Sequence, residues 1–232
     1  MAEERRSFEP GSFEPGPFEF GLDELPDELP IFPLSGALLL PRGNLPLNIF
    51  ESRYLDMTLD ALGAGRLIGM VQPRTADEEA GHPPVFPLGC AGRIVSFSET
   101  DDGRLLISLK GVCHFRIARV REPVRGYRRV APDFRSFVGD LSPDVRSIVD
   151  RELFAAALRR FLDRHGMQVD WEAIRKASDE ALVNSLAMLC PFRPEEKQAL
   201  LEAKTLDDRY ATIVTLLQMA VHDAPEGGGA RQ

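Results

Sequence analysis

Residues 31–59, IFPLSGALLLPRGNLPLNIFESRYLDMTL, are rich in apolar residues but are interrupted at intervals by proline. The prolines are Pro33, Pro41 and Pro46. A membrane-spanning helix needs about 20 consecutive apolar residues, whereas the longest run here is Ala37–Leu40. Proline is excluded from central strand positions, so it marks the ends and edges of short strands. We therefore predict strands and turns up to Phe50, and a helix only after that residue.

The rest of the composition is that of a soluble, cytoplasmic chain. It has 232 residues, 44% of them hydrophobic, and a net charge of −8. Residues 1–30 contain nine acids against Arg5 and Arg6, so most of the negative charge belongs to this segment. A secretory signal begins with basic residues followed by an apolar block, and these acids exclude one.

Residues 1–28 contain a short repeat, SFEPG at 7–11 and again at 12–16, followed by PFEF at 17–20. Proline and glycine in each full unit oppose a helix, and one Phe per unit cannot build a core. We predict a disordered acidic tail, and a flexible C-terminus over residues 223–232. The alternative is a linear motif whose spaced Phe residues dock on a partner or on this protein's own body.

Residues 29–140 carry mostly strand signals. Short apolar runs are bounded by Gly, Pro or Asp, which predicts about six strands in a small barrel. Asp102-Gly103 indicates a hairpin turn. One helix is predicted from an N-cap at Ser52. Its apolar stripe is Tyr54, Leu55, Leu59 and Leu62.

Residues 141–222 change to helical periodicity. An apolar stripe over 149–162 is closed by Gly166, as a helix end is. Further helices are predicted over 171–189 with a break near Ser178, from Pro194 to 203, and over 206–221 with Thr205 as cap. A β-rich half followed by a helical bundle is an α+β fold.

The usual catalytic motifs are absent. The sequence has no G-x-x-x-x-G-K-[ST], G-x-S-x-G or H-E-x-x-H. A Ser108–Lys110 dyad is an alternative without an evident oxyanion hole. Cys113 and His114 are neighbours on one strand and point to opposite faces, so we expect no metal site. The cysteines Cys90, Cys113 and Cys190 fit small buried residues better than disulfides.

One basic run stands out between residues 116 and 135. Its members are Arg116, Arg119, Arg121, Arg125, Arg128, Arg129 and Arg135. Arginines with interleaved aromatics bind phosphate and stack on bases, so RNA binding is the alternative function. A solvent-facing strand pair whose arginines are paired with acids elsewhere, or a face covered by the acidic tail, would give the same pattern.

The quoted stretch resembles the substrate-binding N-terminal domain of the Lon protease family, which also occurs as a freestanding small bacterial protein. The matching residues are Phe32, Pro33, Leu34, Pro41, Leu45, Pro46, Leu47, Ile49, Phe50, Glu51, Arg53 and Tyr54. The departures are Arg42, Asn48 and Ser52, where the family usually has Gly, His and Pro. The resemblance implies a PUA-like pseudobarrel with a helical bundle, a non-catalytic role in polypeptide binding, and no cofactor.

From this resemblance we expect an apolar groove beside the barrel that binds unfolded or partner polypeptides. A separate ATP-dependent protease is a further expected partner, to which this chain would be an adaptor, and we expect no membrane partner. The expected contact residues are Leu40, Leu45, Phe50 and Tyr54, and the expected structural residues are Phe32, Pro33, Pro46, Glu51 and Arg53. The Phe repeats of the tail would mimic a client and occupy the groove until a client displaces them.

Overall fold

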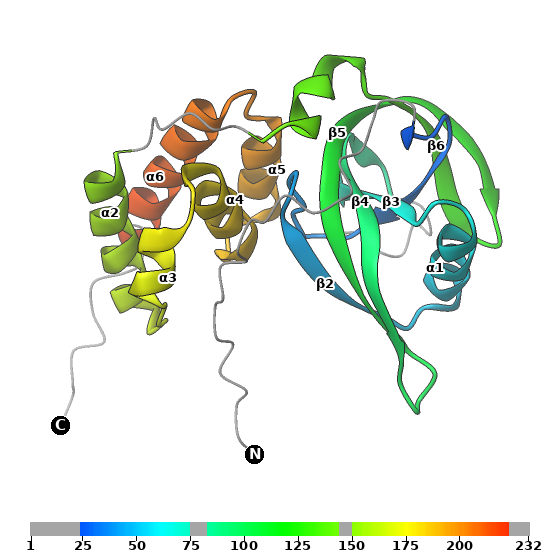
Figure 1. Cartoon of the computed structure of the whole chain (residues 1–232), viewed down its shortest axis with the longest axis horizontal. Coiled ribbons are helices and arrows are strands. Elements are labelled where there is room, and N and C mark those ends of the chain that lie inside the picture. The colour runs from blue at the N-terminus through cyan, green and yellow to red at the C-terminus, as the bar shows by residue number, and fades with distance from the viewer. Residues whose placement is uncertain (1–23, 75–82, 144–149, 223–232) are drawn as a thin grey trace.

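The computed structural model describes residues 24–74, 83–143 and 150–222. Figure 1 shows a β barrel on one side of the molecule and a group of helices on the other. The α+β class predicted from the sequence is therefore confirmed. The Phe repeats and the C-terminal segment lie outside the described residues, so their predictions stay predictions.

The strands form one sheet that closes on itself. They are β1 (Leu29–Pro33), β2 (Asn44–Ile49), β3 (Leu67–Pro73), β4 (Val85–Glu99), β5 (Leu105–Val124) and β6 (Tyr127–Asp133). The order is β2-β5-β4-β3-β1-β6, and β6 also pairs with β5. The length of β5, 20 residues, permits this closure, because its first half pairs with β2 and its second half with β6.

The barrel is filled around the ring of Phe115, which is fully buried. Two glycines on neighbouring strands leave room for this ring. A Cβ atom on Gly69 would lie 2.7 Å from the end of the Phe115 ring, and a Cβ on Gly89 would lie 2.9 Å from the same atom. Since contacts this short do not occur, the two glycines are fixed by the packing of one aromatic side chain.

Helix α1 (Ser52–Gly63) covers part of the barrel. It begins one residue earlier than predicted, because Glu51, in an extended conformation, is the N-cap residue and Ser52 is already helical. The predicted apolar stripe is also partly wrong. The face that packs on the barrel carries Met57 and Ala61, both buried, whereas Leu59 is exposed. The helical spacing of the leucines therefore indicated the wrong face of α1 as the buried one.

The helical lobe contains α2 (Arg151–His165), α3 (Trp171–Lys176), α4 (Asp179–Leu189), α5 (Pro194–Glu202) and α6 (Leu206–His222). Several of its helices begin or end at the capping residues that the sequence predicts. Gly166 ends α2 with a positive φ of 62°. The Ser178 hydroxyl accepts a hydrogen bond from Ala181 N (3.2 Å), and the Thr205 hydroxyl accepts one from Asp208 N (3.1 Å). The short 3₁₀ helix η3 (Arg135–Leu141), which precedes the lobe, was not predicted.

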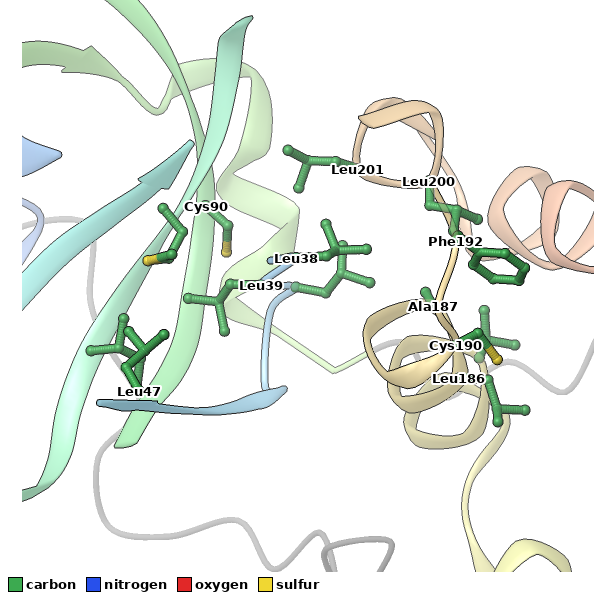
Figure 2. Packing of buried hydrophobic residues seen from close by; sticks show 14 of the residues in the cluster. Leu38, Leu39, Leu47, Cys90, Leu186, Ala187, Cys190, Phe192, Leu200 and Leu201 are labelled. Atoms are coloured by element: carbon green, nitrogen blue, oxygen red, sulfur yellow. The ribbon is translucent and has the colours of Figure 1, made fainter. Parts of the chain in front are cut away.

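The barrel and the helical lobe share one apolar core. Between β1 and β2 the chain makes a loop, residues 34–43, whose leucines Leu38, Leu39 and Leu40 are almost fully buried. Figure 2 shows Leu38 and Leu39 between Leu47 and Cys90 of the barrel and Leu186, Leu200 and Leu201 of the helices. The dense apolar run of the quoted stretch is thus a joint between the two lobes rather than a strand.

Polar contacts reinforce this joint. Arg42 has a φ of 64°, a conformation that favours glycine, and its guanidinium forms an ion pair with Glu180 of α4. Lys197 of α5 donates to the Gly36 carbonyl oxygen (2.7 Å), and the Asn184 amide donates to that of Pro41 (3.3 Å). Burial lowers the pKa of Lys197. Buried charges need such partners, so the loop is held by both lobes.

Candidate functional site

The four predicted contact residues divide sharply by exposure. Leu40 is fully buried and Tyr54 is 8% exposed, while Leu45 packs against the same core at its margin. Phe50 is 64% exposed. A side chain that binds a polypeptide must be reachable from solvent, so of these four Phe50 is the residue to build a site on.

The remaining motif residues form a structural corner between β2 and α1. Arg53 donates to the Glu51 carboxylate (Nε 3.0 Å), and its guanidinium lies 4.7 Å over the ring of Tyr54. Tyr54 in turn contacts Phe32, with ring centroids 4.3 Å apart. The prolines occupy edge positions, since Pro33 ends β1 and Pro46 lies in β2, which among the described strands pairs only with β5.

Exposed apolar side chains gather on the hairpin formed by β4 and β5, which projects beyond the barrel in Figure 1. Val95 is 52% exposed, Phe97 45% and Leu106 44%. Phe50 lies beside them at the end of β2, with the Arg104 guanidinium 5.9 Å from its ring centroid. We call Phe50, Val95, Phe97 and Leu106 the hairpin surface.

Both faces of the hairpin contribute to this surface. Phe97 is paired with Ile107, and Leu106 with Ser98. Residues directly opposite each other share a face and successive residues alternate, so Phe97 and Leu106 project from opposite faces. An apolar side chain exposed on each face is unusual for a solvated strand pair, where one face is normally polar.

The outer edge of the hairpin is also free. Strand β3 pairs with β4 only as far as Arg93, and one more bond joins Ile94 N to the Arg66 carbonyl oxygen (2.8 Å). In the part of the chain that the structure describes, no strand pairs with residues 95–99 on the side away from β5. Backbone donors and acceptors are therefore available beside Val95 and Phe97.

The tip of the hairpin is fixed by local polar contacts. Asp102 forms an ion pair with Arg104 (2.8 Å), and Thr100 N donates to the Arg104 carbonyl oxygen (2.9 Å). A hydrogen bond from the Thr100 hydroxyl, together with the charge of Arg104, lowers the pKa of Asp102. The sequence predicted this turn, but the extension of the strands beyond their β3 partner was not predicted. The available signal was that apolar residues adjacent in sequence, such as Leu105 and Leu106, must face opposite sides of a strand.

The basic run separates into two groups. Four of its arginines have local partners. Arg125 pairs with Asp56 and Asp60, Arg129 with Glu28 and Arg135 with Asp133, while Arg128 donates to the Pro83 carbonyl oxygen. Hydrogen bonds from Arg135 lower the pKa of Asp133 to about 2. Arg125, Arg129 and Arg135 fit the alternative of a strand pair whose arginines are neutralised by acids, whereas Arg128 is held by a backbone carbonyl.

The other three, Arg116, Arg119 and Arg121, lie on β5 and are exposed. Among residues 24–74, 83–143 and 150–222, no acidic side chain forms an ion pair with any of them. We call these three residues the β5 basic strip. It is smaller than the seven-arginine face considered for RNA.

The catalytic and metal alternatives receive no support from the geometry. Lys110 is exposed, whereas a lysine that acts as a general base needs an apolar setting to lose its proton. Cys113 lies in the barrel interior, while His114 turns away to Asp140 (Nδ1 to Oδ2, 2.7 Å). The described residues contain no group of three or more His, Cys, Asp or Glu arranged to hold a metal ion. No helix within those same ranges is long and apolar enough to cross a membrane.

Comparisons with known proteins agree with the fold. The chain is 25% identical over 199 residues to a Lon protease of Anaeromyxobacter dehalogenans and 26% identical over 205 residues to Lon protease 2 of Myxococcus xanthus. Each alignment covers 84% of this chain but only 23% and 24% of the relative. This chain thus spans about a quarter of the length of these relatives.

Among solved structures, the Lon N-terminal domain protein of Xanthomonas campestris aligns with a TM-score of 0.55 at 27% identity. That alignment covers 82% of this chain and 97% of the other. The N-terminal domain of a Mycobacterium avium complex Lon protease aligns with a TM-score of 0.52 over 84% of this chain; at 16% identity, it supports the fold alone. The model of the ATP-dependent protease La (LON) substrate-binding domain matches residues 28–219, and the chain belongs to that family.

Proposed function

We propose that this chain is a non-catalytic binding module that recognises unfolded polypeptides through the hairpin surface. The observation that carries the proposal is the exposure of Phe50, Val95, Phe97 and Leu106 on or beside a projecting hairpin whose β4 edge is free. This proposal replaces the groove expected from the sequence with a projecting hairpin.

The hairpin offers two kinds of contact that an unfolded chain can use. Its free edge can accept an extended segment as an added strand, held by backbone hydrogen bonds that do not depend on sequence. The side chains of Phe97 and Phe50 supply apolar area, and an aromatic ring buries about 150–250 Å² when covered. Apolar burial contributes about 25 cal/mol per Å². The free-energy cost of ordering a flexible client must be subtracted from this gain. Weak, sequence-tolerant binding is the expected result.

The family supports the same role. Its substrate-binding domain is the part of the Lon relatives that this chain matches, and the match covers residues 28–219. We propose that bound polypeptides are passed to a separate ATP-dependent protease, for which this chain is an adaptor. On this proposal the chain contributes recognition and no peptide-bond chemistry.

The test is the affinity of the full chain for a fluorescently labelled, reduced and alkylated protein, measured by anisotropy. The variant F50S/F97S removes two aromatic rings from the hairpin surface. The control, L153S/M219S, removes two apolar side chains of the helical lobe, each 47% exposed. Anchor residues of an interface cost more than about 1 kcal/mol each when truncated, so F50S/F97S should weaken binding about tenfold or more. Equal losses in both variants would contradict the assignment.

A further inference from the structure

The chain enters the barrel beside the β5 basic strip. Leu29, at the start of β1, is paired with Val130 of β6, and Glu28 forms an ion pair with Arg129 of the same strand. On the other side of β6, Ala131 is paired with Arg119. One strand, β6, therefore lies between the β5 basic strip and β1, the strand at which the N-terminal segment enters the barrel.

The side-chain faces also agree. Extending the β1–β6 register by one residue places Glu28 opposite Ala131, which is itself opposite Arg119. Arg121 is opposite Arg129, two residues along each strand. Since residues i and i+2 of a strand share a face, Glu28, Arg119, Arg121 and Arg129 lie on one outer face. Of these, Arg129 is neutralised by Glu28, whereas the strip residues form no such ion pair with any other described residue.

We propose that the leader segment, residues 1–23, binds the β5 basic strip in an extended conformation and covers it. The segment contains six acids against Arg5 and Arg6, and two of the acids, Glu9 and Glu14, lie in its Phe-Glu-Pro repeats. Proline favours an extended backbone, which lets successive carboxylates reach successive arginines. The first such contact, Glu28 with Arg129, already exists within the described residues.

The reach is sufficient. Neighbouring strands lie about 4.8 Å apart, so β5 is about 10 Å from β1, a span of about three extended residues. Leu25 packs against the apolar cluster of the barrel interior, which holds residues 24–28 against this end of the barrel. Asp23 and Glu19 then follow within reach of the strip. A short tether gives the segment an effective concentration of about millimolar.

This assignment is independent of the proposed function, because the strip and the hairpin surface involve different residues. It gives the strip a partner of defined chemistry, an acidic extended segment with interspersed Phe. While the leader is bound, other polyanions, nucleic acid included, are excluded from the strip. Because exposed charges are screened by salt, the contact should be lost at high ionic strength.

The experiment uses the full chain with the substitution S12C, which provides a labelling site within the leader. The native cysteines are all buried, so a nitroxide spin label will attach at residue 12. Backbone amide signals close to the label lose intensity through paramagnetic relaxation. They are recorded at low salt and at about 1 M NaCl, where the screening length is about 3 Å.

The expected result is a loss of amide signal over residues 116–131 at low salt, with recovery at high salt. The triple substitution R116Q/R119Q/R121Q should abolish the loss. The triple substitution R160Q/R175Q/K204Q, which removes three exposed basic groups of the helical lobe, should leave it unchanged. Loss of amide signal around Phe50 and Phe97 instead, or equal amide intensities with and without the label, would overturn the proposal.

Discussion

Gly111 gives the sharpest test of the joint between the two lobes. It lies on β5 directly against the loop of residues 34–43. A Cβ atom there would lie 2.7 Å from the Leu40 carbonyl carbon and would overlap the attached oxygen, and both belong to the backbone. No rotamer change can relieve this overlap, so G111A must displace the loop.

The magnitude follows from what the loop carries. Gly111 N donates to the Gly43 carbonyl oxygen (2.8 Å), and Arg42 N donates to that of Gly111 (2.7 Å). Each bond contributes about 1 kcal/mol. Displacement also loosens the buried leucines of the loop, each worth about 1.5–3 kcal/mol when fully buried. Losing both bonds and part of one leucine's burial lowers the free energy of unfolding by about 3 kcal/mol.

Chemical denaturation of the full chain measures this change, with G63A as the control. Gly63 is the last residue of α1, and a Cβ there meets no atom within 4 Å. Alanine favours helix over glycine by up to about 1 kcal/mol, so G63A should leave stability unchanged or raise it. If G111A is destabilised by less than about 1 kcal/mol relative to wild type, the loop does not join the lobes as described.

Three further predictions concern charge and burial. R42M removes the buried ion pair between Arg42 and Glu180 and should destabilise by about 3 kcal/mol, whereas R53M breaks the exposed Glu51 pair and should cost about 0.5 kcal/mol; similar urea midpoints for the two variants would refute the distinction. Burial alone would raise the pKa of Asp140, but hydrogen bonds from His114 outweigh it and the pKa is lowered. Such a carboxylate stabilises the fold above its unfolded pKa of about 3.9 and loses that contribution as pH falls through the folded value. D140N should therefore lose less stability than wild type between about pH 5 and 3, and parallel urea-midpoint curves would contradict this. Burial raises the pKa of the cysteine thiols, to about 12 for Cys113 and Cys190, so none should react with Ellman's reagent at neutral pH until denaturant is added; rapid reaction of one thiol in the native chain would refute its burial.

Local signals in the sequence were sufficient for most of the helical lobe. The capping residues Ser178 and Thr205 and the helix-ending Gly166 act through their own backbone neighbourhood, so a sequence read in short windows finds them. The turn at Asp102-Gly103 was predictable for the same reason. These features need no knowledge of distant parts of the chain.

Long-range packing was not predictable in this way. In α1 the apolar Leu59 is exposed and the polar Thr58 is buried, the opposite of what their side chains suggest. The reason is that packing on the barrel determines which face of the helix is covered. Leu40 was expected at a binding surface but is buried in the core shared with helices that begin more than a hundred residues further along the chain. The hairpin surface depends on where β3 stops pairing with β4, and strand ends are set by tertiary contacts rather than by local preference.

The most direct test of the proposed function places a photoreactive amino acid at Phe97 of the full chain. A second protein carries it at Leu153, which has a similar exposure on the helical lobe. Both are irradiated with the same labelled unfolded polypeptide. We predict a covalent adduct at residue 97 and little at residue 153, with the adduct at 97 reduced by excess unlabelled polypeptide. Equal adducts at the two positions, or an adduct at 153 alone, would contradict recognition by the hairpin surface.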